Sequence, residues 1–380
     1  MKVVIAMDSF KGSMSSMEAG IAAKEGIARA CDAEVVVKPL ADGGEGTTEA
    51  LVEGLGGTFV SLEVTGPLGG KINVKYGILQ EKKMAVMEMA EAAGITLVKQ
   101  DALNPSRATT YGVGEMILDA VKRGCREFII GIGGSMTSEG GVGMLQALGA
   151  EILGRDGKPI ALGNQDLDSI ASINTEKMPK ELQECHFQIA CDVRNPLCGE
   201  NGAVYVFGAQ KGVREEEKEL FDRKMAYFAE KTKEYIGNDY KMAEGAGAAG
   251  GLGFAFLSYF PNAELKPGID IVIQATGLER EIEEADIVVT GEGFLDAQTA
   301  MGKAPFGIAC LAKKYHALAL AFAGGVAKDA QICNTKGIDA FFPIVREAMA
   351  LKEAMEPANA KENMELAAEQ VFRLLSLKNK

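Results

Sequence analysis

Short apolar runs alternate with helical patterns at both ends of the chain, and this alternation constrains the fold more than any other feature. Near the N-terminus, runs at residues 2–7 and 34–40 are each followed by a loop and then by a helical pattern. The C-terminal part resumes the order, with apolar runs at 286–291, 318–324 and 340–345. Such alternation is typical of a parallel sheet covered by helices. Because neither end supplies a full sheet, we expect both ends to share one Rossmann-like sheet of about five parallel strands.

The middle of the chain follows a different pattern. Runs at 59–64, 72–79 and 84–90 are joined by turn signals such as "GPLGG", which favours antiparallel strands. Further apolar runs, separated by helical patterns, lie at 127–134, 187–193 and 203–212. At 380 residues the chain is long for a single core. We therefore predict that a second, mixed α/β domain at 66–284 is inserted into a discontinuous domain made of 1–65 and 285–380.

The composition restricts the kinds of ligand and macromolecule that the protein is expected to bind. The net charge is -13, which argues against nonspecific binding to nucleic acid or to an acidic membrane. Seven cysteines without a CxxC pair, and no apolar run of the length that a membrane span needs, favour a cytoplasmic protein. Only two histidines are present, so a site of three histidines is excluded. We expect small-molecule ligands, and the composition leaves homo-oligomerisation open.

The loop "DSFKGSMSS" follows the first predicted strand and opens a helix. Ligands of open parallel sheets bind beyond the carboxyl ends of the strands, where Asp8, Ser9 and Lys11 are expected to lie. Ser13 stands near the helix N-terminus, which favours an anion, and Lys11 adds a charge suited to phosphate. We assign catalytic roles to Asp8 and Lys11. The alternative is a helix cap beside a solvated lysine.

The loop "ADGGEG" follows the second strand and also opens a helix. Gly43 and Gly44 would let a ligand approach the backbone closely. The carboxylates of Asp42 and Glu45 would repel a bare phosphate, but they could bind a Mg²⁺ ion that a phosphate also ligates. We assign both as metal ligands and the two glycines to substrate binding. The alternative is a turn in which Asp42 caps its own backbone.

Small hydroxyls and glycines recur after the apolar run at 127–132, in "GIGGSMTSEGG". Gly133, Gly134, Ser135 and Thr137 would offer backbone N–H and hydroxyl donors to a phosphate. The stretch is no Walker A loop, because GxxxxGK[ST] occurs nowhere in the chain. We therefore predict an anion-binding loop without that motif.

Two further strand ends carry charged residues. In "ACDVRNPL", Asp192 emerges from an apolar run and is a candidate general base for a hydroxyl, with Arg194 as a candidate substrate ligand; the alternative for Asp192 is a strand-end cap. "FGAQKG" adds Gln210 and Lys211 nearby, without an assigned role.

The segment "TGEGFLDAQTAMGK" is the densest in candidates. Glu292 and Asp296 could hold Mg²⁺ or orient a hydroxyl. We assign Glu292 as a metal ligand, Asp296 as catalytic, and Gln298 and Thr299 as substrate ligands. The alternative is packing within the loop.

Together the motifs resemble those of the bacterial type 1 glycerate kinases, and the resemblance runs from Lys2 to the C-terminus. In chain order these are "DSFKGSMSS", "PLADGGEGT", "TTYGVGE", "GIGGSMTSEGG", "ACDVRNPL", "FGAQKG", "GAAGGLG" and "TGEGFLDAQTAMGK". The resemblance implies a two-domain α/β fold. It also implies transfer of the γ-phosphoryl group of ATP to D-glycerate, giving 2-phosphoglycerate, with ATP and Mg²⁺ as cofactors and the reaction in the cleft between the domains.

Four positions depart from the pattern of that family. Phe294 stands where the family usually has an arginine, and Arg194 stands where it usually has an uncharged or acidic residue. Ser138 and Glu139 replace a more usual Asn-Asp pair. Two alternatives therefore stay open: a kinase of another small hydroxy acid, and a noncatalytic metabolite-binding regulator on the same fold.

Overall fold

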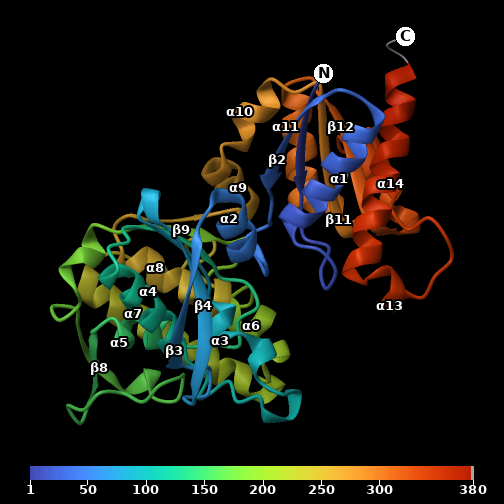
Figure 1. The fold of residues 1–380 in the computed structure, drawn as a ribbon. Helices are drawn as coiled ribbons and strands as arrows, with labels where there is room; N and C mark the ends of the chain where they lie inside the picture. Colours follow the sequence, from blue (N-terminus) through green and yellow to red (C-terminus); the bar gives the residue numbers. More distant parts are fainter. Residues whose placement is uncertain (378–380) are drawn as a thin grey trace. The chain divides into compact units, whose positions relative to one another are not determined.

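The computed structural model describes residues 1–377, and they divide into two compact units (Figure 1). Unit 1 comprises Met1–Asp42, Glu49–Gly56 and the described chain from Ile269 onwards. Unit 2 comprises Gly43–Thr48 and Gly57–Gly268. Each unit is built on its own sheet, so each is described separately.

The sheet of unit 1 is parallel throughout, with strand order β13-β12-β11-β1-β2. Its strands are β1 (Lys2–Met7), β2 (Glu34–Pro39), β11 (Ile287–Leu295), β12 (Leu318–Val326) and β13 (Ala340–Pro343). Strand β1 pairs with β2 on one side and with β11 on the other. The expectation that both ends of the chain share a parallel sheet is therefore confirmed.

Helices cover this sheet because both of its faces are apolar. Val3, Ile5 and Met7 join a buried cluster with residues of α1 (Ser16–Ala30) and α14 (Pro357–Ser376). Since side chains alternate along a strand, Val4 and Ala6, also fully buried, point to the opposite face. Helix α1 lies directly against α14: a Cβ added at Gly26 would come 2.1 Å from the carbonyl oxygen of Glu365. The remaining helices of this part of the chain are α2 (Thr47–Leu55, which begins in unit 2), α9 (Gly268–Thr276), α10 (Leu278–Glu283), α11 (Ala304–Lys314), α12 (Ile332–Thr335) and α13 (Leu351–Ala354).

Unit 2 has a mixed sheet with strand order β10-β9-β6-β5-β4-β3. Its strands are β3 (Thr58–Thr65), β4 (Lys71–Leu79), β5 (Met84–Glu88), β6 (Glu127–Gly131), β9 (His186–Ala190) and β10 (Ala263–Lys266). β3, β4 and β5 pair antiparallel, whereas β5, β6, β9 and β10 pair parallel. A hairpin of β7 (Glu151–Gly154) and β8 (Ile170–Asn174) stands apart from this sheet. The helices are α3 (Ala90–Ala93), α4 (Tyr111–Lys122), α5 (Val142–Ala147), α6 (Ala203–Phe207), α7 (Lys218–Ile236) and α8 (Leu252–Tyr259).

The fold class agrees with the prediction: along the sequence, a mixed α/β unit separates the segments of a Rossmann-like unit. The apolar run at 203–212 is helical, however: α6 is followed by a short 3-10 helix at Ala209–Lys211. The units change at residue 57, ahead of β3, and again at residue 269. The division into two domains with boundaries near 65 and 285 stays a prediction. None of the helices within residues 1–377 is long and apolar enough to cross a membrane.

Candidate active site

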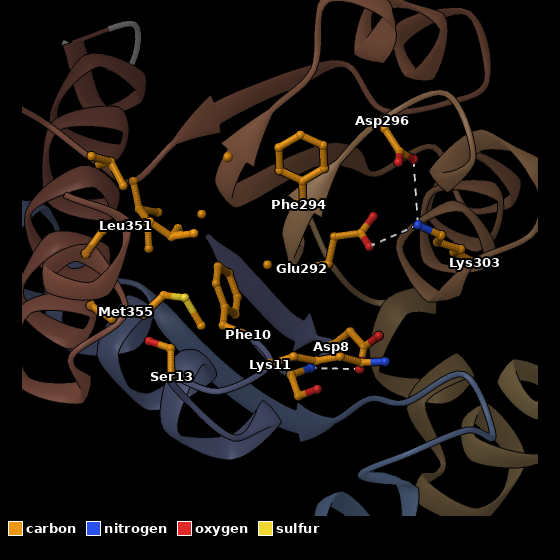
Figure 2. Close-up of a pocket in the computed structure, with 18 of the residues that line it drawn as sticks. Asp8, Phe10, Lys11, Ser13, Glu292, Phe294, Asp296, Lys303, Leu351 and Met355 are labelled. Atoms are coloured by element: carbon orange, nitrogen blue, oxygen red, sulfur yellow. Dashed lines mark hydrogen bonds and ion pairs between the residues drawn. The ribbon is translucent and has the colours of Figure 1, made fainter. Parts of the chain in front are cut away.

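A cavity of about 510 Å³ opens in unit 1 where β1, β11 and β12 end (Figure 2). Ligand sites of open α/β sheets lie beyond the carboxyl ends of the strands, and their volumes typically span about 300–1,000 Å³. One part of the wall is polar and carries charged residues: Asp8, Ser9, Lys11, Ser13, Asp42, Glu292, Asp296 and Lys303. The other part is apolar: Phe10, Phe294, Ile344, Val345, Leu351, Ala354, Met355 and Ala360. Nine residues predicted for the site belong to unit 1, and seven of them line this cavity.

The loop after β1 is held as a tight turn. Phe10 and Met14 exchange backbone hydrogen bonds of 2.9 and 3.0 Å, and Gly12 between them has a φ of +75°, which glycine adopts without strain. The turn leaves Lys11 exposed at its tip. The buried hydroxyl of Ser13 has no hydrogen-bond partner in the described chain. A cationic tip and an unused hydroxyl on the cavity wall are suited to an anionic ligand.

Four carboxylates lie close enough in this wall to affect one another. Burial, followed by the charge of Asp42, raises the pKa of Asp8 to about 7, although the backbone N–H of Ser9 donates to its carboxylate at 2.7 Å. Burial is also the main cause that raises the pKa of Glu292, and the charges of Asp296 and Asp42 add to it. Carboxyl groups whose pKa is raised by their neighbours favour a cation among them.

Lys303 supplies part of that positive charge. Its ammonium lies 3.8 Å from a carboxylate oxygen of Glu292 and 3.6 Å from one of Asp296 (Figure 2). The lysine is the residue that directly precedes α11. Its two acidic partners could not be read from the sequence.

The segment after Glu292 uses most of its polar groups internally. The carboxylate of Asp296 accepts the backbone N–H groups of Gln298 and Thr299 at 2.9 and 3.1 Å. The hydroxyl of Thr299 donates to Glu292 at 2.5 Å. Thr299 is buried and Gln298 is exposed, and neither lines the cavity. Thr299 therefore orients Glu292, and the assignment of these two residues to substrate binding stays a prediction.

The carboxylates do not form a complete metal cage. Within residues 1–377, no group of three or more His, Cys, Asp or Glu side chains is placed to hold a metal ion. Mg²⁺ usually takes only one or two protein carboxylates and completes its shell with phosphate oxygens and water. Burial raises the pKa of Asp8 and of Glu292, and the charge of Asp42 adds to both shifts, so these three carboxylates fit such a partial site. Glu45, the other predicted ligand, is exposed and belongs to unit 2.

Phe294, one of the positions that the sequence analysis found to depart from the expected pattern, lines the cavity. Its side chain is 55% exposed, and a Cβ added at Gly325 of the neighbouring strand would come 2.8 Å from its ring. The ring therefore lies against the bare backbone of Gly325. Together with Leu351 and Met355 it gives the cavity an apolar side, which a charged sugar acid alone would not need.

Unit 2 gathers a second group of predicted residues at the carboxyl ends of β6 and β9. A Cβ added at Gly43 would come 2.6 Å from that of Ala190, and one added at Gly131 would come 2.5 Å from the carbonyl oxygen of Gly43. The carboxylate of Asp192 accepts the backbone N–H of Gly268 at 3.2 Å. Glycine is required here because the two backbones leave no room for a side chain.

The loop after β6 holds the other predicted anion ligands. Gly133 and Gly134 are exposed, whereas Ser135 and Thr137 are buried. Lys211 donates to the hydroxyl of Ser135 at 2.8 Å and to the carbonyl oxygen of Thr137 at 2.7 Å. The sequence showed this lysine in "FGAQKG" but gave no sign that it is buried.

Two of the unusual positions differ in their surroundings. Glu139 is fully buried, and its carboxylate accepts hydrogen bonds from the backbone and hydroxyl of Thr110 and from the backbone of Gly143. It therefore fastens the loop to the first turns of α4 and α5. Arg194 has 85% of its side chain exposed and lies 3.9 Å from Glu244. At that exposure the ion pair contributes little, so the guanidinium is available to a ligand.

The chain is similar to known proteins over nearly its whole length. Residues 3–376 match the family described as the glycerate kinase family. The chain is 42% identical over 379 residues to a protein of Haemophilus influenzae named glycerate kinase, covering 100% of both chains. It is 42% identical over 359 residues to an Escherichia coli protein named glycerate 2-kinase, covering 94% of both. A crystal structure from Salmonella typhimurium LT2, described as a glycerate kinase 2, superposes with a TM-score of 0.91 at 41% identity and covers 100% of this chain and 99% of that one.

Proposed function

Because this chain belongs to the glycerate kinase family, we propose that it transfers the γ-phosphoryl group of ATP to the 2-hydroxyl of D-glycerate, giving 2-phosphoglycerate and ADP, with Mg²⁺ as the metal. Glycerate kinases are phosphotransferases with an alcohol acceptor, and they take a nucleotide as the second substrate. The choice of ATP, of Mg²⁺ and of the 2-hydroxyl is the part that we propose.

The cavity of unit 1 is the observation that carries the proposal. It combines a lysine at a turn tip, a second lysine between two acids, and carboxylates whose pKa values are raised by burial and by one another. Phosphoryl transfer needs little covalent help from the protein and depends on positioning and on neutralising charge. Its volume of about 510 Å³ and its apolar side exceed what a three-carbon acid fills, so a nucleotide fits it better.

Each residue has a role in this proposal. Lys11 and Lys303 would bind phosphate oxygens, and Ser9 and Ser13 would donate hydrogen bonds to them. Asp8, Asp42 and Glu292 would hold Mg²⁺, which when bound neutralises charge on the phosphates. Asp296, which the sequence predicted as catalytic, would act here as an orienting carboxylate, because it holds Lys303 and the backbone of residues 298 and 299 in place.

The acceptor is assigned to unit 2. Asp192 would accept the proton of the glycerate hydroxyl while the oxygen forms its bond to phosphorus and the bridging oxygen leaves with ADP. Gly43, Gly44, Gly133, Gly134, Ser135 and Thr137 would supply backbone and hydroxyl donors, and Arg194 would pair with the glycerate carboxylate. The proposal requires that the two units act as domains that share one reaction, in a cleft between them.

The test follows ADP formation with D-glycerate, L-glycerate and other 2-hydroxy acids, with Mg²⁺ present or chelated. We expect turnover with D-glycerate, and chelation of Mg²⁺ should abolish it. The product is identified by phosphorus NMR. Coupling of the phosphorus to one methine proton identifies the 2-phosphate, and coupling to a methylene group identifies the 3-phosphate. Turnover with another hydroxy acid alone would favour the substrate change that Phe294 and Arg194 suggest, and no turnover with any acid would favour a binding protein.

A further inference from the structure

Lys211 is a buried cation without an acidic partner. Only 2% of the residue is exposed, in the short 3-10 helix Ala209–Lys211, and its ammonium donates to the hydroxyl of Ser135 and to the carbonyl oxygen of Thr137. Among residues 1–377 it forms no ion pair. A buried ammonium held by neutral groups alone costs free energy that a paired one does not.

The neighbouring segments do not compensate this charge. Their ionisable side chains include Arg107, Glu139, Tyr205 and Arg214, and none of them is a cause of the pKa shift of Lys211. One carboxylate oxygen of Glu139, Oε1, accepts hydrogen bonds from Thr110 and Gly143, and Oε2 has no hydrogen-bond partner in the described chain. Burial alone lowers the pKa of Lys211 to about 7. The lysine therefore changes its protonation within the physiological range.

The loop above Lys211 presents unused donors. Gly133 and Gly134 are exposed, Gly134 has a φ of +68°, and the hydrogen bonds of the described chain do not use the N–H group of either. The hydroxyl of Ser135 accepts from Lys211, so its own proton can be donated away from the lysine. A hydroxyl that accepts from a cation is a stronger donor, because the two hydrogen bonds polarise each other.

We propose that the loop 133–135 binds an oxyanion of one substrate, a phosphate or a carboxylate, and that Lys211 beneath it takes up a proton when that anion binds. Lys211 is a positioning residue here, since it acts through the hydroxyl of Ser135. The inference rests on the proposed function for the identity of the substrates, but it is measured by binding and not by turnover.

Proton linkage gives the expected number of protons that the protein takes up when the anion binds. With a pKa of about 7, about a tenth of the lysine is protonated at pH 8 in the free protein. An anion that raises this pKa by about 1–2 units would bring the protonated fraction to about half to nine-tenths. Binding at pH 8 should therefore take up about 0.4–0.8 proton. The sign is fixed, because a raised pKa in the complex means uptake and not release.

The experiment is titration calorimetry at pH 8 in two buffers of different ionisation enthalpy, with inorganic phosphate, Mg²⁺-ADP and D-glycerate as three separate probes. Proton uptake with phosphate or Mg²⁺-ADP alone would identify the anion as phosphate, and uptake with D-glycerate alone would identify it as carboxylate. Either supports the proposal. No uptake with any probe would overturn it, even if the protein turns over glycerate normally. If turnover is absent but phosphate still binds with uptake, the proposed function fails and this inference stands.

Two variants complete the test. Lys211→Met keeps the length of the buried chain and should lose the uptake, while the matched change of an exposed lysine of the same unit, Lys158→Met, should keep it. Uptake that persists undiminished in folded Lys211→Met protein would overturn the assignment. If Lys211→Met does not fold, the pH dependence of the unaltered protein decides: affinity for the bound probe should fall severalfold from pH 7 to pH 9, and a constant affinity would refute the proposal.

Discussion

Replacing Asp8 with asparagine should stabilise the protein at alkaline pH. The pKa of Asp8 is raised to about 7, chiefly by burial and then by the charge of Asp42, from an ordinary value of 3.8. The folded state therefore holds a proton that the unfolded state releases between these two values. As the pH rises from 3.8 through 7, ionised Asp8 progressively destabilises the folded protein, by about 4 kcal/mol at most.

The expected effect of Asp8→Asn can be followed with pH. Asparagine has almost the same shape and never ionises, so the variant avoids this loss. From the two pKa values, its advantage over the parent should grow by about 2–3 kcal/mol between pH 5 and pH 8. Mg²⁺ should stabilise the parent at pH 8 more than the variant, because a cation among the carboxylates favours the ionised form. Turnover should fall, since the variant loses a charge in the proposed metal site.

The assay is urea unfolding followed by far-ultraviolet circular dichroism, because the chain contains no tryptophan for fluorescence. Asp32→Asn is the matched control: this exposed residue of unit 1 should show no pH-dependent advantage. A stability difference for Asp8→Asn that stays constant between pH 5 and pH 8, or that favours the parent at pH 8, would refute the reasoning.

Three further substitutions test the proposed roles. Lys11→Ala should reduce kcat at least about 100-fold, equivalent to about 2.7 kcal/mol of barrier, and near-normal turnover in the folded variant would remove Lys11 from the phosphate site. Asp192→Asn should keep nucleotide affinity and reduce turnover by about 10²–10⁴-fold, because Asp192 is the proposed general base. A loss of stability without a loss of turnover would make Asp192 a strand-end cap. Arg194→Ala should raise KM for D-glycerate more than about tenfold while KM for ATP stays the same, since a guanidinium binds a carboxylate with two hydrogen bonds. Unchanged kinetics would leave Arg194 a surface residue.

The parallel sheet of unit 1 could be predicted because it is buried on both faces. Such strands read as continuous apolar runs, and β1, β11 and β12 carry them with little interruption. The loops that follow were predictable as ligand sites for the same reason, since the carboxyl ends of parallel strands meet at one edge. That is how Asp8, Lys11 and Glu292 were singled out from the sequence.

Short apolar segments were harder to predict. The run at 203–212 reads equally well as a strand or as a buried helix, and the structure makes it helical between Gly202 and Gly212. β10, at Ala263–Lys266, was missed because it follows a polar turn and carries only two apolar residues. In both places packing or strand pairing with segments far away in the sequence decides the conformation.

Side-chain direction within loops could not be predicted at all. Thr299 turns inward to Glu292, Glu139 is fully buried, and Lys211 points beneath the loop after β6. In sequence each of them looks like an exposed polar loop residue. Their burial depends on hydrogen-bond partners at unpredictable distances along the chain: Glu292 lies 7 positions from Thr299, Thr110 lies 29 from Glu139, and Ser135 lies 76 from Lys211.

The two units leave opposite charges uncompensated. In unit 1, Asp8, Asp42 and Glu292 carry more negative charge than Lys11 and Lys303 offset, and burial, together with the charges of neighbouring acids, raises the pKa values of Asp8 and Glu292. In unit 2, a buried lysine has no acid at all. A protein selected for stability alone would have lost both features, because each costs folding free energy. A metal-bound phosphate offsets the first and an oxyanion offsets the second. A chain with a net charge of -13 can therefore bind anionic substrates, because the charge that matters is local.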